Sequence, residues 1–92
     1  MTAERQIETF GEILETHMAR LGYHGQTVGN YSEDDKIIFK FRLQADLEKT
    51  YQRIESDWEK ICVEMYADDI GLRMWGENLE MRFSRRDVMF LD

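Results

Sequence analysis

Three side chains are candidates for a catalytic cysteine–histidine pair: the single cysteine, Cys62, and the two histidines, His17 and His24. A catalytic pair needs an imidazole within hydrogen-bond reach of the thiol. The spacing predicts His17 on a helix, near the edge of its apolar stripe, and places His24 just after the glycine that ends this helix. A packed thiol and two partly exposed rings are the simpler interpretation. We therefore expect no enzyme activity, and an enzyme that uses Cys62 is the alternative hypothesis.

Carboxylates are abundant, but their spacing does not predict a metal site. Adjacent acids such as Asp34–Asp35 and Asp68–Asp69 suit turns, where they are usually solvated. The first pair lacks the alternating oxygen ligands and final glutamate of a calcium loop, and a zinc site needs more cysteine and histidine at ligand spacing. The glycine motifs of phosphate-binding loops and nucleophile elbows do not occur in the sequence. We expect no metal and no cofactor.

A row of acids is more informative. Glu4, Glu8, Glu12 and Glu15 fall within an arc of roughly 80° on a predicted helix, and a four-residue step repeats about every 6 Å. Like charges four residues apart cost a few tenths of a kcal/mol each, so helix stability gives no reason for the row. It could occupy lysine and arginine sites built for a phosphate backbone, or it could simply be a solubilising face. The acidic turn Glu33, Asp34 and Asp35 belongs to the same predicted acidic face.

Basic residues gather on the predicted strands. In the segment 36–43, Lys36, Lys40 and Arg42 alternate with an apolar set, and Arg82, Arg85 and Arg86 lie close together near the C-terminus. This basic face, with Arg73 on a neighbouring strand, could contact RNA phosphates or an acidic partner. Without a second layer over it, Ile38 and Trp75 would be exposed among the charges. An ordinary solvated sheet face is the other interpretation.

The elements that position these residues follow from hydrophobic periodicity. Apolar spacings of three and four predict a helix over residues 3–21, with Thr2 as its N-cap and Gly22 after its end. The same spacing returns from Ala45 and predicts a second helix. Its end is ambiguous, because Ile61, Val63 and Met65 also alternate as in a strand, so residues 60–66 are either helix or strand.

Alternation with period two predicts the strands. The segment 36–43 has Ile37, Phe39, Phe41 and Leu43 on its apolar face, and residues 26–32 form a weaker strand that reaches it through the turn at 33–35. Strands at 70–75 and 79–84 join through Gly76, Glu77 and Asn78. Val88, Phe90 and Leu91 are expected to pack on the fold. The resulting fold class is α+β, with two helices on a small antiparallel sheet in the order α-β-β-α-β-β; no residue-level repeat is visible between the halves.

Composition limits the class of protein. The 92 residues form one domain, 1–92, with 42% hydrophobic and 34% charged residues and a net charge of −7. This charge argues against attraction of the whole surface to nucleic acid or anionic membrane. One cysteine suits a reducing cytoplasm, and neither a secretory signal nor an apolar run of roughly 18 residues is visible. We expect a cytoplasmic protein.

Charge is also segregated along the chain. Residues 1–35 hold seven acids and two bases, whereas residues 36–43 carry three bases and no acid. In size, charge, αβ make-up and lack of motifs, the chain resembles phage-encoded anti-CRISPR proteins that inhibit type I surveillance complexes. The resemblance covers the whole chain, and the acid row, the acidic turn and the basic strand carry it.

The resemblance implies a mechanism and a partner. Such inhibitors wedge into a guide-RNA-loaded complex of Cas proteins, with type I-F the expected subtype, in the cytoplasm of the host bacterium. They keep target DNA from its binding groove by imitating its phosphates or by covering the guide RNA. Acids would face the lysine-rich DNA path and bases the guide RNA or an acidic subunit, with no membrane and no small-molecule substrate as partner.

A different binding module is the main alternative. An acidic antitoxin or immunity protein, or a small adaptor, would bind a nuclease toxin or another basic protein surface by the same charge logic. Composition does not separate these two functions. A toxin gene next to this one would favour the alternative, and a phage operon with a small helix-turn-helix regulator would favour the inhibitor.

Overall fold

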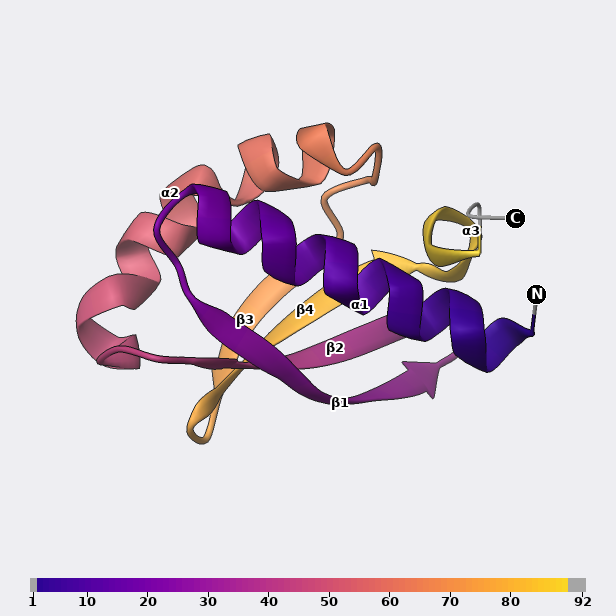
Figure 1. The fold of residues 1–92 in the computed structure, drawn as a ribbon, viewed down its shortest axis with the longest axis horizontal. Coiled ribbons are helices and arrows are strands. Elements are labelled where there is room, and N and C mark those ends of the chain that lie inside the picture. Colours follow the sequence, from indigo (N-terminus) through magenta and orange to yellow (C-terminus); the bar gives the residue numbers. More distant parts are fainter. Residues whose placement is uncertain (1, 90–92) are drawn as a thin grey trace.

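Two helices cover one face of a four-stranded antiparallel sheet in the computed structural model, which describes residues 2–89 (Figure 1). The elements are α1 (Ala3–Arg20), β1 (Gly25–Glu33), β2 (Lys36–Leu43), α2 (Leu47–Glu64), β3 (Gly71–Trp75), β4 (Asn78–Ser84) and the short α3 (Arg85–Val88). The α+β class and the order α-β-β-α-β-β are therefore confirmed. Val88 packs in the core as expected, and Phe90 and Leu91 lie outside the described residues.

Helix α1 begins and buries its apolar stripe as its sequence predicts. The Thr2 hydroxyl accepts a hydrogen bond from the Arg5 amide at 3.2 Å and satisfies one of the free amides at the helix start. Phe10, Leu14 and Met18 are buried on the side that faces the sheet. The helix therefore presents the opposite and flanking positions, which carry the acid row, to solvent or to the sheet edge.

Helix α2 continues to Glu64, so the strand alternative for residues 60–66 is wrong. Asp46 caps its start by accepting a hydrogen bond from the Lys49 amide at 3.2 Å. Ile61 and Met65 are buried, whereas Val63 between them is 66% exposed. A strand would have placed all three side chains on one face. Instead, only Ile61 and Met65 of these three, four residues apart, are buried in the core, and this spacing is typical of a helix.

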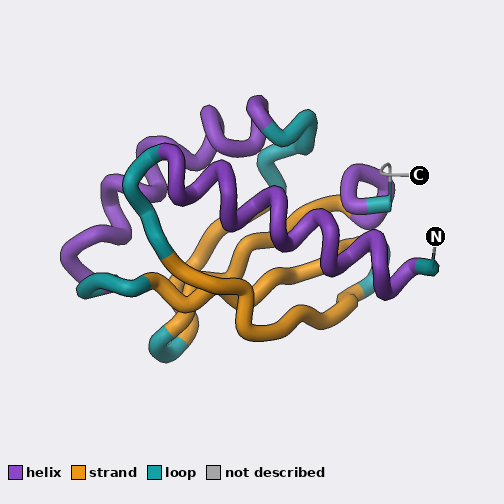
Figure 2. Tube along the Cα trace, in the orientation of Figure 1, coloured by secondary structure: helices purple, strands orange, loops and turns teal. Residues whose placement is uncertain are grey.

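The sheet has the strand order β1-β2-β4-β3, so β2 and β4 are central and β1 and β3 form the edges. Two-residue turns join the strands of each hairpin (Figure 2). The predicted loop at 76–78 is one residue shorter than expected, because Asn78 already pairs with Trp75. Gly76 has φ +63° at the first turn position, where type II′ hairpin turns favour glycine.

The core lies between the sheet and the two long helices. Ile37, Phe39 and Phe41 of β2 and Leu79, Met81 and Phe83 of β4 are fully or almost fully buried and contact residues of α1 and α2 there. The apolar face predicted for residues 36–43 is thus confirmed. The other face of the sheet carries no second layer within residues 2–89, and this face is called the outer face below.

The two halves of the chain repeat the same αββ unit. The N-caps of the two helices, Thr2 and Asp46, are 44 residues apart, and so are the left-handed residues that follow the helices, Gly22 and Tyr66. The two helices therefore correspond residue by residue from start to end. The hairpins also correspond pair by pair, since the β1–β2 register from Gly29 onward matches the β3–β4 register from Gly71 onward. The β2–β4 pairing is symmetric about Phe39 and Met81. The repeat is therefore one of backbone geometry, which explains why sequence comparison of the halves does not show it.

Both helices end in the same C-terminal hydrogen-bond motif, but with different residues at its left-handed position. After α1, the Tyr23 amide donates to the Met18 carbonyl, and Gly22 has φ +91°. After α2, the Ala67 amide donates to the Cys62 carbonyl, and Tyr66 has φ +55° with 91% of its surface exposed. Glycine is the usual residue at this position because it has no Cβ. Tyr66 therefore holds a strained conformation without burial of its ring.

We expect Tyr66→Gly to stabilise the protein by about 0.5–1 kcal/mol, because glycine adopts positive φ without the steric cost that tyrosine bears. Urea unfolding followed by circular dichroism measures the change in the free energy of unfolding. Gly22→Ala, at the equivalent position after α1, is the matched control and should destabilise by a similar amount. A loss of stability in Tyr66→Gly would mean that the tyrosine ring makes a stabilising contact.

Candidate functional site: two charged surfaces

The outer face gathers the predicted basic residues of three strands. Lys36, Lys40 and Arg42 alternate with the core residues of β2 and so point to the outer side. The register places Arg82 of β4 opposite Ile38, and Arg73 of β3 opposite Glu80. The sheet thus brings Arg73 and Arg82 to the same face as the basic residues of β2, as the sequence predicts.

Glu80 lies at the centre of this face and was not identified from the sequence. Its carboxylate Oε1 accepts hydrogen bonds from the Arg73 Nε at 2.8 Å and from the Tyr31 hydroxyl at 3.1 Å, and the Arg73 Nη2 lies 2.7 Å away. The Glu80 residue is only 4% exposed. The hydrogen bond to Glu80 raises the pKa of Arg73, so the guanidinium stays charged and neutralises the carboxylate.

Two aromatic rings flank this centre, each beside a cation. The Arg73 guanidinium lies 4.5 Å from the centroid of the Trp75 ring, and the Lys40 Nζ lies 5.6 Å from that of Tyr31. Cations at these distances are attracted to the ring face. Trp75 is 61% exposed, as the sequence predicts. The face therefore combines positive charge with an accessible aromatic surface.

The prediction that Ile38 is exposed on this face is wrong, because Ile38 is fully buried although it lies outside the core cluster. Its neighbours across the strands are Tyr31 and Arg82, and Lys40 lies two residues along β2. Long side chains cover apolar area with their stems and rings while keeping their polar ends in water. The side chains of the outer face thus cover Ile38 without a second layer.

Arg85 and Arg86 lie apart from the basic strands. Both belong to α3, which contacts α1 on the helix side of the sheet. The Arg86 Nη2 lies 3.4 Å from Asp68 Oδ2, and the Arg85 amide donates to the Asp35 carbonyl at 2.7 Å. Their closeness to Arg82 in sequence does not place them on the outer face, because the chain turns into α3 directly after Ser84.

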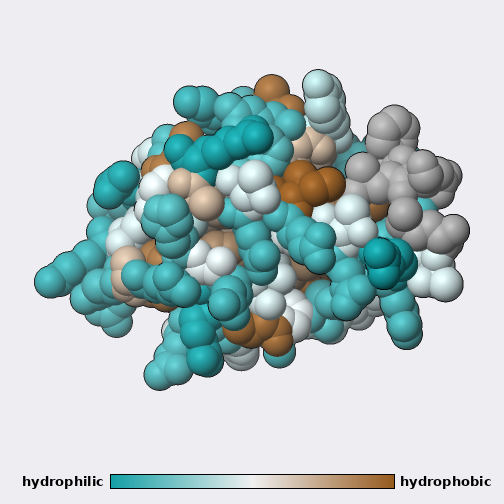
Figure 3. All heavy atoms as spheres, viewed as in Figure 1, coloured by the Kyte–Doolittle hydropathy of each residue, from teal (hydrophilic) through white to brown (hydrophobic). Residues whose placement is uncertain are grey.

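The acid row lines two adjoining grooves between α1 and the edge strand β1. Glu8, Glu12 and Glu15 line a groove of about 370 Å³ with residues 27–30, and Glu4 and Glu8 line the next, of about 340 Å³. Ile7 contributes apolar surface to both. In Figure 3, hydrophilic residues dominate this side of the molecule, and apolar residues form only separate spots. The row is therefore a continuous acidic border beside the sheet edge.

Glu15 differs from the other members of the row because it has a structural role. Its Oε2 accepts hydrogen bonds from the Thr27 amide at 2.6 Å and from the Thr27 hydroxyl at 2.9 Å. The β1–β2 register shifts between Thr27 and Gly29, and such a bulge leaves backbone groups without a ladder partner. Glu15 thus fixes α1 to the irregular part of β1.

We expect Glu15→Ala to lower the free energy of unfolding by about 1–3 kcal/mol, because it leaves a partly buried amide and hydroxyl without their charged acceptor. The matched control is Glu8→Ala, an exposed position in the same row, which should change stability by no more than about 0.5 kcal/mol. Thermal and urea unfolding of both variants measure the difference. Equal effects of the two substitutions would contradict the structural role of Glu15.

The acidic turn at residues 33–35 contacts the basic residues of the outer face and not the acid row. The Glu33 Oε2 lies 3.6 Å from the Arg82 Nη2, and the Asp35 Oδ1 lies 3.3 Å from the Lys36 Nζ. Asp34 occupies the turn at φ +56°, which aspartate tolerates better than most residues. The grouping of these three acids with the acid row is therefore not reproduced by their contacts.

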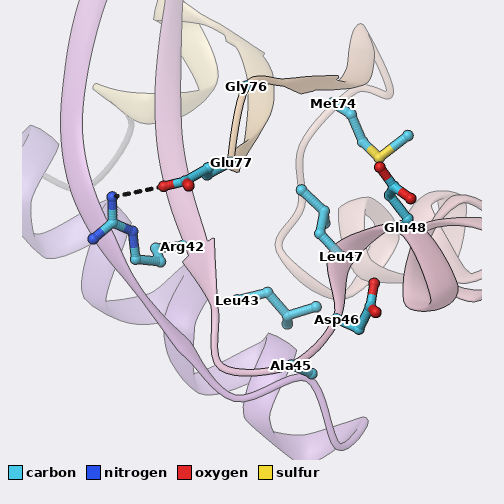
Figure 4. A pocket seen from close by; sticks show the side chains of 9 residues that line it. All are labelled: Arg42, Leu43, Ala45, Asp46, Leu47, Glu48, Met74, Gly76 and Glu77. Atoms are coloured by element: carbon cyan, nitrogen blue, oxygen red, sulfur yellow. Dashed lines mark ion pairs between the residues drawn. The ribbon is translucent and has the colours of Figure 1, made fainter.

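A third concave region lies where β2 passes into α2, beside the β3–β4 turn (Figure 4). It has a volume of about 620 Å³ and combines the apolar Leu43, Leu47 and Met74 with acids on its rim. The Arg42 Nη2 and the Glu77 Oε2 are 3.9 Å apart across one side. Both side chains are largely exposed, so this pocket offers no desolvated acid, base or nucleophile.

The candidate catalytic side chains do not form a pair with an activated thiol. Cys62 is buried, and burial, with smaller contributions from Asp69 and Asp87, raises the pKa of its thiol from 9.0 to about 12. The His17 Nδ1 lies 3.5 Å from a carboxylate oxygen of Glu64, whereas His24 is exposed. A reactive cysteine needs the opposite environment, which lowers the thiol pKa.

We expect native Cys62 to react with iodoacetamide at pH 8 about a thousand times more slowly than in the unfolded chain, because the thiolate reacts and its pKa is about 12 instead of 9.0. Mass spectrometry of the labelled protein with and without urea measures both rates. The raised pKa also makes stability fall between about pH 9 and pH 12, since the unfolded thiol ionises first. Fast labelling of the native protein would support the hypothesis of an enzyme that uses Cys62.

Two further features concern residues 2–89, a metal-binding group and a membrane-spanning helix. No group of three or more histidine, cysteine, aspartate or glutamate residues is placed to hold a metal ion there. No helix in the same part of the chain combines the length and apolarity needed to cross a membrane. Comparison with known proteins adds no relative: no family model, no curated protein and no solved structure matches the chain.

Proposed function

We propose that the chain is a non-enzymatic inhibitor that binds a nucleic-acid-handling protein complex. The observation that carries this proposal is the separation of charge between an acid row beside the sheet edge and a basic outer face with exposed Trp75. The buried Cys62 thiol supports a role without catalysis. The resemblance to anti-CRISPR proteins makes a guide-RNA-loaded type I surveillance complex the first target to test.

The two surfaces suit different parts of such a target. Carboxylates of Glu4, Glu8 and Glu12, about 6 Å apart along α1, can occupy cationic sites that normally receive DNA phosphates. The affinity of duplex DNA for such a path is mainly electrostatic, so an acidic protein can compete with it. Lys40 and Arg42 can meanwhile contact guide RNA or an acidic subunit.

The test uses a purified, guide-loaded type I-F surveillance complex and its target DNA in a gel-shift assay. We expect the wild-type protein to block DNA binding. The double variants Glu8→Lys/Glu12→Lys and Lys40→Glu/Arg42→Glu should each abolish the block while circular dichroism shows a retained fold. Lys49→Glu/Lys60→Glu, on exposed positions of α2, changes the net charge as much as the second pair and is the control. Intact inhibition by both test variants would contradict the electrostatic mechanism.

An immunity protein or antitoxin is the second candidate. The observation that favours it is the groove with Ile7 between the acids Glu8 and Glu12, which suits a basic protein surface with apolar side chains. Tagged protein used as bait in lysate of a bacterium with an active type I system separates the two functions. Recovery of the surveillance complex supports the inhibitor, and recovery of a single nuclease toxin supports the alternative.

A further inference from the structure

We infer that the outer face binds single-stranded nucleic acid, with phosphates on Lys40 and Arg82 and an unpaired base stacked on Trp75. This inference rests on the proposed function and gives its basic surface a ligand class. An inhibitor that covers a guide would meet RNA in this form. The assignment follows from the state of the acids on the face, the availability of the cations, and the exposed indole.

The acid at the centre of the face does not oppose the binding of phosphate. A free carboxylate there would repel phosphate, but Glu80 is 4% exposed and lies 2.7 Å from the Arg73 guanidinium. The Tyr31 hydroxyl donates a further hydrogen bond to it. The charge of Glu80 is therefore neutralised by Arg73 within the protein.

Two cations of the face are available to a phosphate. Within residues 2–89, Lys40 forms no ion pair with a carboxylate. Arg82 has only a loose pair, 3.6 Å from the half-exposed Glu33, and such exposed pairs contribute little. In the β2–β4 register Lys40 lies opposite Glu80, two residues from Arg82. This diagonal places the two cations roughly 7–8 Å apart at the backbone, within reach of one nucleic-acid strand.

The exposed ring of Trp75 favours nucleic acid over an acidic protein as the ligand. Trp75 is 61% exposed at the end of β3, and the guanidinium of Arg73, which Glu80 fixes, lies 4.5 Å from its ring. Bases stack on such rings whatever their sequence, provided that they are unpaired. An acidic peptide would use the cations without needing the indole. Because the bases of a duplex are paired and stacked on one another, a single strand can place a base on Trp75 more readily than a duplex can.

The test is fluorescence anisotropy with fluorescein-labelled ten-nucleotide oligouridylate and oligodeoxythymidylate, using the full chain. In 50 mM salt we expect a Kd below about 100 μM, since non-specific contacts reach this range. The two phosphate contacts predict about sevenfold weaker binding when the salt is raised from 50 to 200 mM. Preference for the RNA probe would assign the face to RNA, and equal binding would assign it to single strands of both kinds.

Variants locate the binding on the outer face. Lys40→Glu/Arg82→Glu should weaken binding at least tenfold, and Trp75→Ala, an exposed position, should weaken it at least fivefold through lost stacking. Lys49→Glu/Lys60→Glu on α2 changes the net charge equally and should weaken it less than twofold. Thermal unfolding shows whether each variant folds, and Trp75→Ala keeps the test decisive if the charge variant does not fold.

Several results would overturn the inference. These are no binding of either probe up to about 100 μM, equal weakening by the two charge variants, or no effect of Trp75→Ala together with equal competition by a decaglutamate peptide. The last result would assign the face to an acidic protein. Inhibition of the surveillance complex without oligonucleotide binding would remove this inference alone, whereas oligonucleotide binding without inhibition would remove the proposed function alone.

Discussion

Phe83→Ala is expected to lower the free energy of unfolding by about 3–5 kcal/mol, the usual cost of truncating a fully buried aromatic side chain. Phe83 joins both helices to the sheet. Its ring centroid lies 4.9 Å from that of Phe10 in α1, 5.9 Å from that of Phe39 in β2, and 5.6 Å from that of Trp58 in α2. The substitution therefore leaves a cavity where three elements meet, and none of them can collapse into it without losing its other contacts.

This loss is a large part of the roughly 5–15 kcal/mol that stabilises a typical domain. Urea unfolding followed by circular dichroism and by the fluorescence of buried Trp58 measures it. Phe83→Leu keeps most of the volume and should cost less than about 1.5 kcal/mol. A cost for Phe83→Ala as small as that of Phe83→Leu would show that the aromatic cluster relaxes around the cavity.

Gly25→Ala is the second substitution with a large expected effect, about 2–3 kcal/mol of lost stability from overpacking. A Cβ atom at Gly25 would lie 2.3 Å from the Arg42 carbonyl oxygen and 2.6 Å from the Phe41 ring. The first neighbour is backbone of the paired strand, so relief requires the two strands to move apart. Calorimetry measures the drop in Tm.

Gly29→Ala is the matched control, because it lies in the same strand and its Cβ would meet only the Lys40 side chain at 3.9 Å. Alanine also suits a strand better than glycine does, so Gly29→Ala should leave stability unchanged or raise it slightly. Similar destabilisation by both substitutions would mean that strand β1 rejects alanine for a reason other than contact with Arg42 and Phe41.

The sequence predicts the elements well where one periodicity dominates. The stripe of α1 and the alternation of β2 each define a buried face, and the structure uses those faces. The end of α2 required tertiary information, because Ile61 and Met65 fit either periodicity and only the exposure of Val63 decides between them. Tyr66 marks the same limit, since nothing local predicts a tyrosine at a left-handed position.

The sequence predicts which charged residues lie on the outer face, but it does not predict which residues contact one another there. Alternation places Lys40 on the outer side of its strand, but the strand order determines that Arg73 and Arg82 are its neighbours there. The role of Glu80 and the burial of Ile38 depend on register across three strands, which a single sequence does not specify. Glu15 looked like any other member of the acid row until the bulge at Thr27 supplied its partner.

The matching αββ halves explain how one carboxylate can sit at the centre of the outer face. A homodimer of identical halves would have to carry the same residue at the positions of Ile38 and Glu80, which correspond in the repeat. Two glutamates there would be diagonal neighbours and would repel each other, and two isoleucines would leave no acceptor for the side chains at the positions of Tyr31 and Arg73, which correspond as well. With both halves in one chain, each position can differ. Because both halves lie in one chain, the sheet combines a nearly symmetric backbone with an asymmetric polar centre at Glu80.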